Sequence, residues 1–193
     1  MKTKFFAIVL LFSFVFYSCN TEKKQEAVKS EVKQEVKANK GHGQAGVTAA
    51  EGEQPNALQV AKSLEDFSTL VAAIEAAGVQ DAVVNTGPLT VLAPLNSAFA
   101  KLPEGTVETL VKPENKAKLA YILTNHVAPA NYPIKQLKKE AKKGRKLYMA
   151  SGKYLVVENK DGEIYVGGTK ILKSVKVSNG WIHVIDDVLV PAE

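Results

Sequence analysis

Cysteine is almost absent from this chain of 193 residues, since Cys19 is the only one. A single cysteine excludes an internal disulfide framework and any zinc site that needs several thiolates. Hydrophobic residues, by contrast, make up 46% of the chain, which is enough for a folded core and excludes disorder of the whole protein. The length favours one domain, with or without an appendage.

A strong charge bias is also missing. The formal net charge is +5, but Lys2 and Lys4 belong to a segment that we expect to be removed. The remaining +3 comes from 17 basic and 14 acidic residues after Pro55, because the stretch from Asn20 to Pro55 holds six of each sign. This excess is too small to indicate a nucleic-acid binder, so no nucleic-acid partner is expected.

Motifs that carry catalysis or bind metal are missing as well. The sequence has no Gly-x-Ser-x-Gly elbow, and no His-x-x-x-His or Cys-x-x-Cys spacing. His126 and His183 lie in apolar surroundings, where a histidine is more often a hydrogen-bonded structural residue than a ligand. We therefore predict no enzymatic activity, no catalytic residue, no metal site and no cofactor.

The amino terminus has the pattern of an export signal. Met1–Lys4 is basic, and Phe5–Val15 is apolar apart from Ser13. A transmembrane helix would need about 20 apolar residues, and the chain is strongly polar from Asn20 onward. Residues 1–18 are therefore predicted to be a signal peptide.

The lone cysteine lies directly after this segment. Phe16-Tyr17-Ser18-Cys19 resembles the lipobox of bacterial lipoproteins, in which the cysteine is acylated and becomes the first mature residue. Ser18 is the small residue that such a site prefers, whereas Phe16 stands where the family usually has Leu. The resemblance implies lipidation at Cys19, which would anchor the protein in the bacterial cell envelope. The membrane that we expect is the outer one, with the domain facing the periplasm or the cell surface.

Residues 19–55 are predicted to be a flexible, lipidated tether. They contain no aromatic residue, and Lys29, Lys33 and Lys37 would stack like charges one helical turn apart. The glycines between 41 and 52 disfavour a helix further. The folded domain is expected to cover residues 56–193.

Within that domain the first half favours helices and the second half favours strands. The helices are expected at Ser63–Ala77, with Ser63 as the cap and Gly78 as the stop, from Asn96 to about Leu102, and at Pro113–Asn125. The strands are expected at Leu89–Ala93, Tyr154–Val157, Glu163–Val166, Ile171–Val177 and Trp181–Val190. This order indicates an α+β domain without internal repeats.

Two stretches resemble the signature boxes of the fasciclin domain family. They are Gly87–Phe99 and Asn179–Pro191, and Leu119–Val127 between them resembles the family's helix that ends in a Tyr-His pair. Here Asn125 replaces the usual Tyr, while His126 is retained. The resemblance implies one fasciclin-like domain, a β-rich wedge with helices packed against it.

Five residues in these stretches are expected to be structural. Asn96 is predicted to cap the helix that follows it, and Phe99 to close the turn into the core. Asp186 is predicted to be an internal hydrogen-bond partner, and His126 and His183 to be buried and satisfied.

The densest charge lies between residues 135 and 146, where Glu140 is the only acid. Ile134, Leu137 and Ala141 are expected to face inward. The basic residues form either a solvated face or a contact surface for anionic lipid or polysaccharide; they are Lys135, Lys138, Lys139, Lys142, Lys143, Arg145 and Lys146.

Together these features favour a lipid-anchored, non-enzymatic adhesion or interaction module with an unknown protein, polysaccharide or lipid partner. The first alternative is a carrier of a lipid or another small apolar ligand, which would need an apolar cleft too large for a core. The second is a hydrolase, which would need convergent polar side chains in a cleft.

Overall fold

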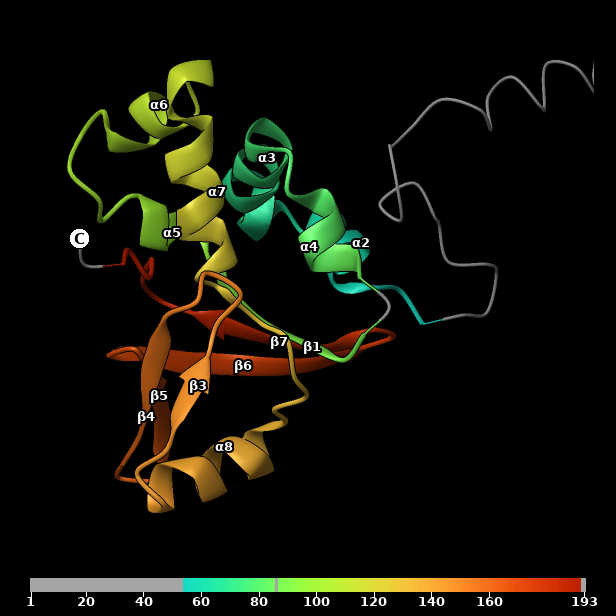
Figure 1. Cartoon of the computed structure of the whole chain (residues 1–193), viewed down its shortest axis with the longest axis vertical. Helices are drawn as coiled ribbons and strands as arrows, with labels where there is room; N and C mark the ends of the chain where they lie inside the picture. Colours follow the sequence, from blue (N-terminus) through green and yellow to red (C-terminus); the bar gives the residue numbers. More distant parts are fainter. Residues whose placement is uncertain (1–53, 86, 192–193) are drawn as a thin grey trace, which may run out of the picture. The chain divides into compact units, whose positions relative to one another are not determined.

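The computed structural model describes residues 54–85 and 87–191 (Figure 1). The predicted signal peptide, Cys19 and nearly all of the predicted tether lie outside these residues. None of the helices in the described part has the length and hydropathy that a membrane span requires.

One mixed sheet of seven strands organises the domain. Its spatial order is β2-β1-β7-β6-β5-β4-β3, with β1 and β7 parallel and the other described pairs antiparallel. The strands are β1 (Leu89–Pro94), β2 (Val127–Ala128), β3 (Lys146–Tyr148), β4 (Tyr154–Lys160), β5 (Glu163–Val166), β6 (Thr169–Val177) and β7 (Gly180–Ile185).

Helices lie on both sides of this sheet. The α-helices are α2 (Ala57–Lys62), α3 (Ser68–Ala77), α4 (Gln80–Val84), α5 (Asn96–Phe99), α6 (Thr106–Leu110), α7 (Lys116–Thr124) and α8 (Ile134–Lys142), and the short 3₁₀ turns are η2 (Glu65–Phe67) and η3 (Pro113–Asn115). Helices α2 to α7 gather beside β1 and β7, whereas α8 lies apart from them near β3, β4 and β5 (Figure 1).

Two hydrophobic cores result from this arrangement. The first packs α2, α3, α4 and α7 against one face of β1 and β7, including Val91 and Ile182. The second lies under α8 and includes Leu92 and Ile185 from the opposite face of the same two strands. Because β1 is buried on both faces, it reads as a continuous apolar run rather than an alternating one.

The prediction of one helix over Ser63–Ala77 is wrong in its first turn. Leu64 has an extended backbone and is 47% exposed, so the chain breaks there before α3 begins at Ser68. Ser63 ends α2 and its hydroxyl donates to the carbonyl of Val60, instead of capping a following helix. Asn56 provides the capping box, in reciprocal hydrogen bonds with Gln59.

The last predicted strand also ends early. β7 stops at Ile185, which pairs with Ile171 at the far end of the β6–β7 ladder. Residues 186–191 continue as an irregular segment whose main chain is held by side chains, described below. The α+β class, the single domain and β5 agree with the prediction, and β1 is longer by one residue, Pro94.

Candidate functional site

The basic run predicted from the sequence folds as α8 and the turn after it. Lys135, Lys138, Lys139 and Lys142 recur at i, i+3, i+4 and i+7 and therefore share one face of the helix. Leu137 is fully buried on the other side, and Ile134 and Ala141 are partly buried, as predicted. We call the seven exposed basic residues the α8 basic surface: Lys135, Lys138, Lys139, Lys142, Lys143, Arg145 and Lys146.

Glu140 compensates little of this charge. Its carboxylate is buried, accepts a hydrogen bond from the Gln136 side chain and lies 3.6 Å from Nη1 of Arg145. Within the described residues the six lysines of the surface have no acidic partner. Their charge is therefore available to an anionic surface from outside.

His126 is a buried structural residue. Its Nδ1 donates to the carbonyl of Ile122 (2.8 Å), so its Nε2 is the acceptor for the backbone N–H of Leu189 (2.9 Å). Burial lowers the pKa of His126 from 6.5 to about 4, against the smaller opposing effect of the hydrogen bond to Ile122. The ring is neutral at neutral pH and fastens the C-terminal segment to the end of α7.

His183 is satisfied in the same manner. Its Nε2 donates to the carbonyl of Tyr132 (2.7 Å), and its Nδ1 accepts from the hydroxyl of Ser174 (2.8 Å). Burial lowers the pKa of His183 as well. A serine hydroxyl on an imidazole is one part of a hydrolytic site, but this ring is fully buried and its second nitrogen binds a carbonyl instead of a carboxylate. The geometry does not favour the hydrolase alternative.

Asn96 caps a different helix from the one predicted. Its Oδ1 accepts from the backbone N–H of Thr69 in the first turn of α3 (3.0 Å), and its Nδ2 donates to the Glu65 carbonyl and the Ser68 hydroxyl. The helix that Asn96 itself begins, α5, has no side-chain cap. Phe99, in the same helix, is partly buried against the first core, as expected.

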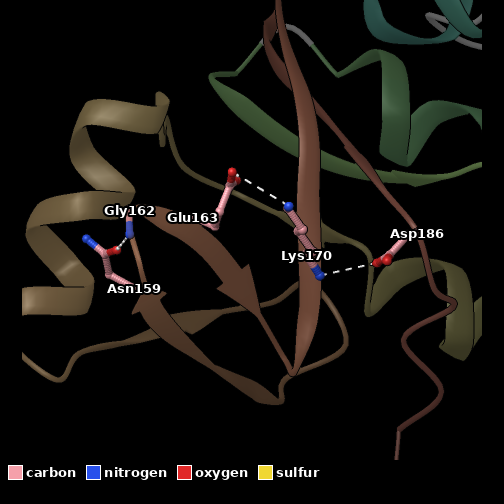
Figure 2. Close-up of polar contacts among 5 residues, drawn as sticks. All are labelled: Asn159, Gly162, Glu163, Lys170 and Asp186. Carbon is pink, nitrogen blue, oxygen red and sulfur yellow. Dashed lines mark hydrogen bonds and ion pairs between the residues drawn. The ribbon is translucent and has the colours of Figure 1, made fainter.

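Asp186 binds neither histidine. Its Oδ1 accepts from the Thr169 hydroxyl (2.9 Å) and from the backbone N–H of Lys170 (3.2 Å), and these bonds fix the start of β6. Figure 2 shows the bond to Lys170. Lys170 also lies 3.6 Å from Glu163 of β5, on the same part of the sheet (Figure 2). Asp186 is thus an internal hydrogen-bond partner, as predicted, but its partners are on β6.

An apolar cavity lies beside α5, α6 and α7, closed on one side by Val188 and Val190. Phe99 and the ring of His126 are part of its lining. It holds about 20 Å³, which is close to the space of one water molecule. A lipid does not fit a cavity of this size, so this conformation does not favour the carrier alternative.

A larger and open depression lies where the C-terminal segment passes the ends of the strands. We call it the strand-end groove; it has a volume of about 460 Å³ and is lined by Asn125, Lys153, Tyr154, Leu155, Gly167, Gly168, Thr169, Asp187, Val188, Leu189, Val190 and Pro191. No sequence pattern indicates this groove, because its residues come from four separate segments.

Within the described residues, no three His, Cys, Asp or Glu side chains are placed to hold a metal ion together. The described part of the chain offers the α8 basic surface and the strand-end groove for contact with a partner.

Comparison with known proteins gives one family. The family model of the fasciclin domain matches residues 65–191. The chain is 46% identical over 135 residues to protein sll1483 of Synechocystis, covering 69% of this chain and 72% of that protein. It is 31% identical over 139 residues to the transforming growth factor-beta-induced protein ig-h3 of Sus scrofa, of which it spans 19%.

A solved structure shows the same fold. It is a FAS1 domain pair from the insect cell adhesion molecule Fasciclin I, with a TM-score of 0.63 and 22% sequence identity. The match covers 70% of this chain and 51% of that structure, which contains two such domains.

Proposed function

Because this chain belongs to the fasciclin domain family, we propose that it is a non-enzymatic adhesion or interaction module, held by a lipid anchor in a bacterial cell envelope. The likeness to an insect cell adhesion molecule supports the adhesive role. The lipobox-like residues ending at Cys19 support the anchor. The partner that we propose is an anionic surface, met by the α8 basic surface.

The observation that carries this proposal is the stripe of lysines on α8, which have no acidic partner in the part of the chain that the structure describes. Lysine is a compact point charge on a flexible stem, which suits a diffuse array of anions better than a single bidentate site, where arginine is preferred. Near a negatively charged membrane each basic residue contributes about 1 kcal/mol, so a few lysines of this stripe suffice for measurable binding. Exposed charges are screened within about 8 Å at physiological ionic strength, so such binding weakens with salt.

Vesicle binding by residues 54–193, which lack the anchor, tests the surface. Changing Lys138, Lys139, Lys142 and Lys143 to Glu should abolish sedimentation with anionic phosphatidylglycerol vesicles. The control changes four exposed lysines elsewhere to Glu, with the same change of net charge, and should keep most of the binding; they are Lys112, Lys116, Lys173 and Lys176. A parallel arm with polygalacturonate distinguishes a polysaccharide from a lipid surface. Equal binding by both variants would contradict the proposal.

The anchor is tested separately, by labelling cells with a fatty-acid probe. The wild type should be labelled and remain with the membranes, whereas Cys19→Ala should be unlabelled and either released or unprocessed. Cys19 lies outside the described residues, so this test does not depend on the fold. Equal labelling of the two proteins would exclude Cys19 as the lipidation site.

A further inference from the structure

The strand-end groove is built where two turns of the sheet meet the C-terminal segment, beside Asn125. Lys153 comes from the turn between β3 and β4, Gly167 and Gly168 come from the turn between β5 and β6, and residues 187–191 form the remaining wall. Binding sites are commonly found on loops that a rigid sheet positions in this way. The volume of about 460 Å³ lies within the range of about 300–1,000 Å³ that is typical of small-ligand sites.

One exposed aromatic ring, that of Tyr154, lines the groove, and the ring of Tyr148 lies beside it. Tyr154 is 63% exposed and lines it, and Tyr148 is 48% exposed. The two are direct partners in the β3–β4 ladder, with ring centroids 5.3 Å apart and planes inclined by 56°. Aromatic faces carry partial negative charge and attract the weakly positive C–H groups of a ligand.

Two ionised side chains of opposite sign line the same groove. Lys153 and Asp187 are both exposed, and within the described residues neither side chain has a hydrogen-bond or ion-pair partner. A single ammonium and a single carboxylate leave the groove without a charge preference. The ammonium of Lys153 can donate a hydrogen bond to a ligand hydroxyl, and the carboxylate of Asp187 can accept one.

Gly167 and Gly168 of the β5–β6 turn line the groove with backbone and without side chains. A Cβ on Gly167 would come within 2.8 Å of the Leu189 side chain, and both glycines have positive φ. A Cβ on Gly168 would meet nothing within 4 Å, so the space above it is open. Backbone without side chains at this point lets a flat ligand approach closely.

From this combination we propose that the strand-end groove binds a short, neutral oligosaccharide. A pyranose ring has C–H faces that stack on Tyr154 and hydroxyl edges that reach Lys153 and Asp187. A lipid is disfavoured because polar groups interrupt the lining. On the β3 side of Tyr154 and Leu155 a peptide cannot add as a strand, because both residues already pair with β3 there. An anionic ligand would gain nothing from the balanced charges.

Calorimetric titration of the full-length protein in detergent micelles tests this site. The probes are cellotetraose, maltotetraose and chitotetraose, each up to about 10 mM, the range of weak single-site binding. We expect at least one to bind. Tyr154→Ala should weaken that binding by about tenfold or more, because a stacked aromatic ring is a main anchor of such a contact. Asp187→Asn should weaken it by a smaller factor.

Matched variants outside the groove separate binding from folding. Tyr121→Ala removes a tyrosine that is 39% exposed on α7, and Asp66→Asn changes an exposed acid in η2. Both should bind the sugar like the wild type, and all four variants should keep the wild-type circular dichroism spectrum. The absence of binding by every probe, or binding that Tyr154→Ala and Asp187→Asn leave unchanged, would overturn the proposal.

Salt distinguishes this site from the α8 basic surface. Sugar binding in the groove should persist in 0.5 M NaCl and in the variant with four lysines of α8 changed to Glu, whereas binding to anionic vesicles should be lost in both. The two proposals can therefore fail independently.

Discussion

At the scale of single residues, the side chains of Asn125 and His126 hold the segment that follows β7. They bind its main chain, which has no strand partner there. The Nδ2 of Asn125 donates to the carbonyl of Leu189 (3.1 Å), and the Nε2 of His126 accepts from the N–H of the same residue. The Oδ1 of Asn125 accepts from the hydroxyl of Ser151 (2.8 Å), so the buried amide is satisfied at both ends. Asn125, which stands where the family usually has Tyr, thereby fastens the C-terminal segment together with His126.

This arrangement predicts a loss of stability in mild acid. The folded state holds His126 neutral down to a pKa of about 4, while an unfolded histidine takes up its proton near 6.5. Between these values the unfolded state binds more protons, so the free energy of unfolding falls as the pH falls from about 6.5 to 4. The loss by pH 4 should be about 3 kcal/mol from His126, with a further contribution of the same sign from His183.

Urea unfolding at pH 7, 5.5 and 4 measures this effect. His126→Gln should be less stable than the wild type at pH 7, because Gln cannot reproduce both hydrogen bonds. Its stability should nevertheless fall less steeply with pH, since it has no ring to protonate. Wild-type and variant curves that run parallel from pH 7 to 4 would show that His126 does not couple protonation to folding.

At the scale of elements, the sequence predicts where the apolar strands lie. It does not predict which distant residues cap the helices or pair with the short strands. β1 and β5 are clear because their composition and flanking turns are local signals. The cap of α3 is not local, since Asn96 lies 27 residues away from Thr69. The short strands β2 and β3 exist through pairing with β1 and β4, and three residues or fewer give no periodicity to recognise.

Gly180 illustrates such a long-range constraint on β7. It pairs with Leu89 of β1, has a φ of 143°, and a Cβ there would lie 1.8 Å from the Leu89 carbonyl oxygen. Gly180→Ala must therefore push β1 and β7 apart where both strands begin. We expect a loss of about 4 kcal/mol or more, or failure to fold.

Gly152→Ala is the matched control for that substitution. Gly152 also has positive φ, 82°, but a Cβ there meets nothing within 4 Å. Only the backbone strain remains, so urea unfolding should show a loss of about 1–2 kcal/mol. Equal losses for the two variants would mean that the contact with Leu89 does not determine the effect.

At the scale of the whole domain, the sheet separates two cores and leaves each side with its own surface. The α8 basic surface could be predicted because its residues all lie in one short stretch of sequence, 135–146, and α8 is amphipathic. The strand-end groove could not, because Lys153, Gly168 and Asp187 come together only through the antiparallel pairing of β3 to β6 and the path of residues 186–191. The family resemblance predicted the fold, but it did not predict which side chains line this groove.

The contacts of residues 55–61 define where the folded domain begins. The carbonyl of Pro55, in the last residue of the predicted tether, accepts from the N–H of Ser178 (3.1 Å), and Ala57 donates to the side chain of Asn179 (3.1 Å). Helix α2 buries Ala57, Leu58 and Ala61 in the first core. Residues 1–53 should therefore be dispensable for folding, whereas α2 should not.

Two truncations measured by thermal unfolding test this limit. Removing residues 1–53 should change Tm by less than about 5 °C, which corresponds to about 1–2 kcal/mol in a domain of this size. Removing residues 1–63 also deletes α2 and the capping box at Asn56, and exposes the core that Leu58 covers. Its Tm should fall by more than about 10 °C, because burial of a leucine and two alanines is lost together with the hydrogen bonds from Ala57 to Asn179 and from Ser178 to Pro55. A large decrease already in the first truncation would mean that residues before 54 pack onto the domain, and equal Tm values for both would mean that α2 contributes nothing to the first core.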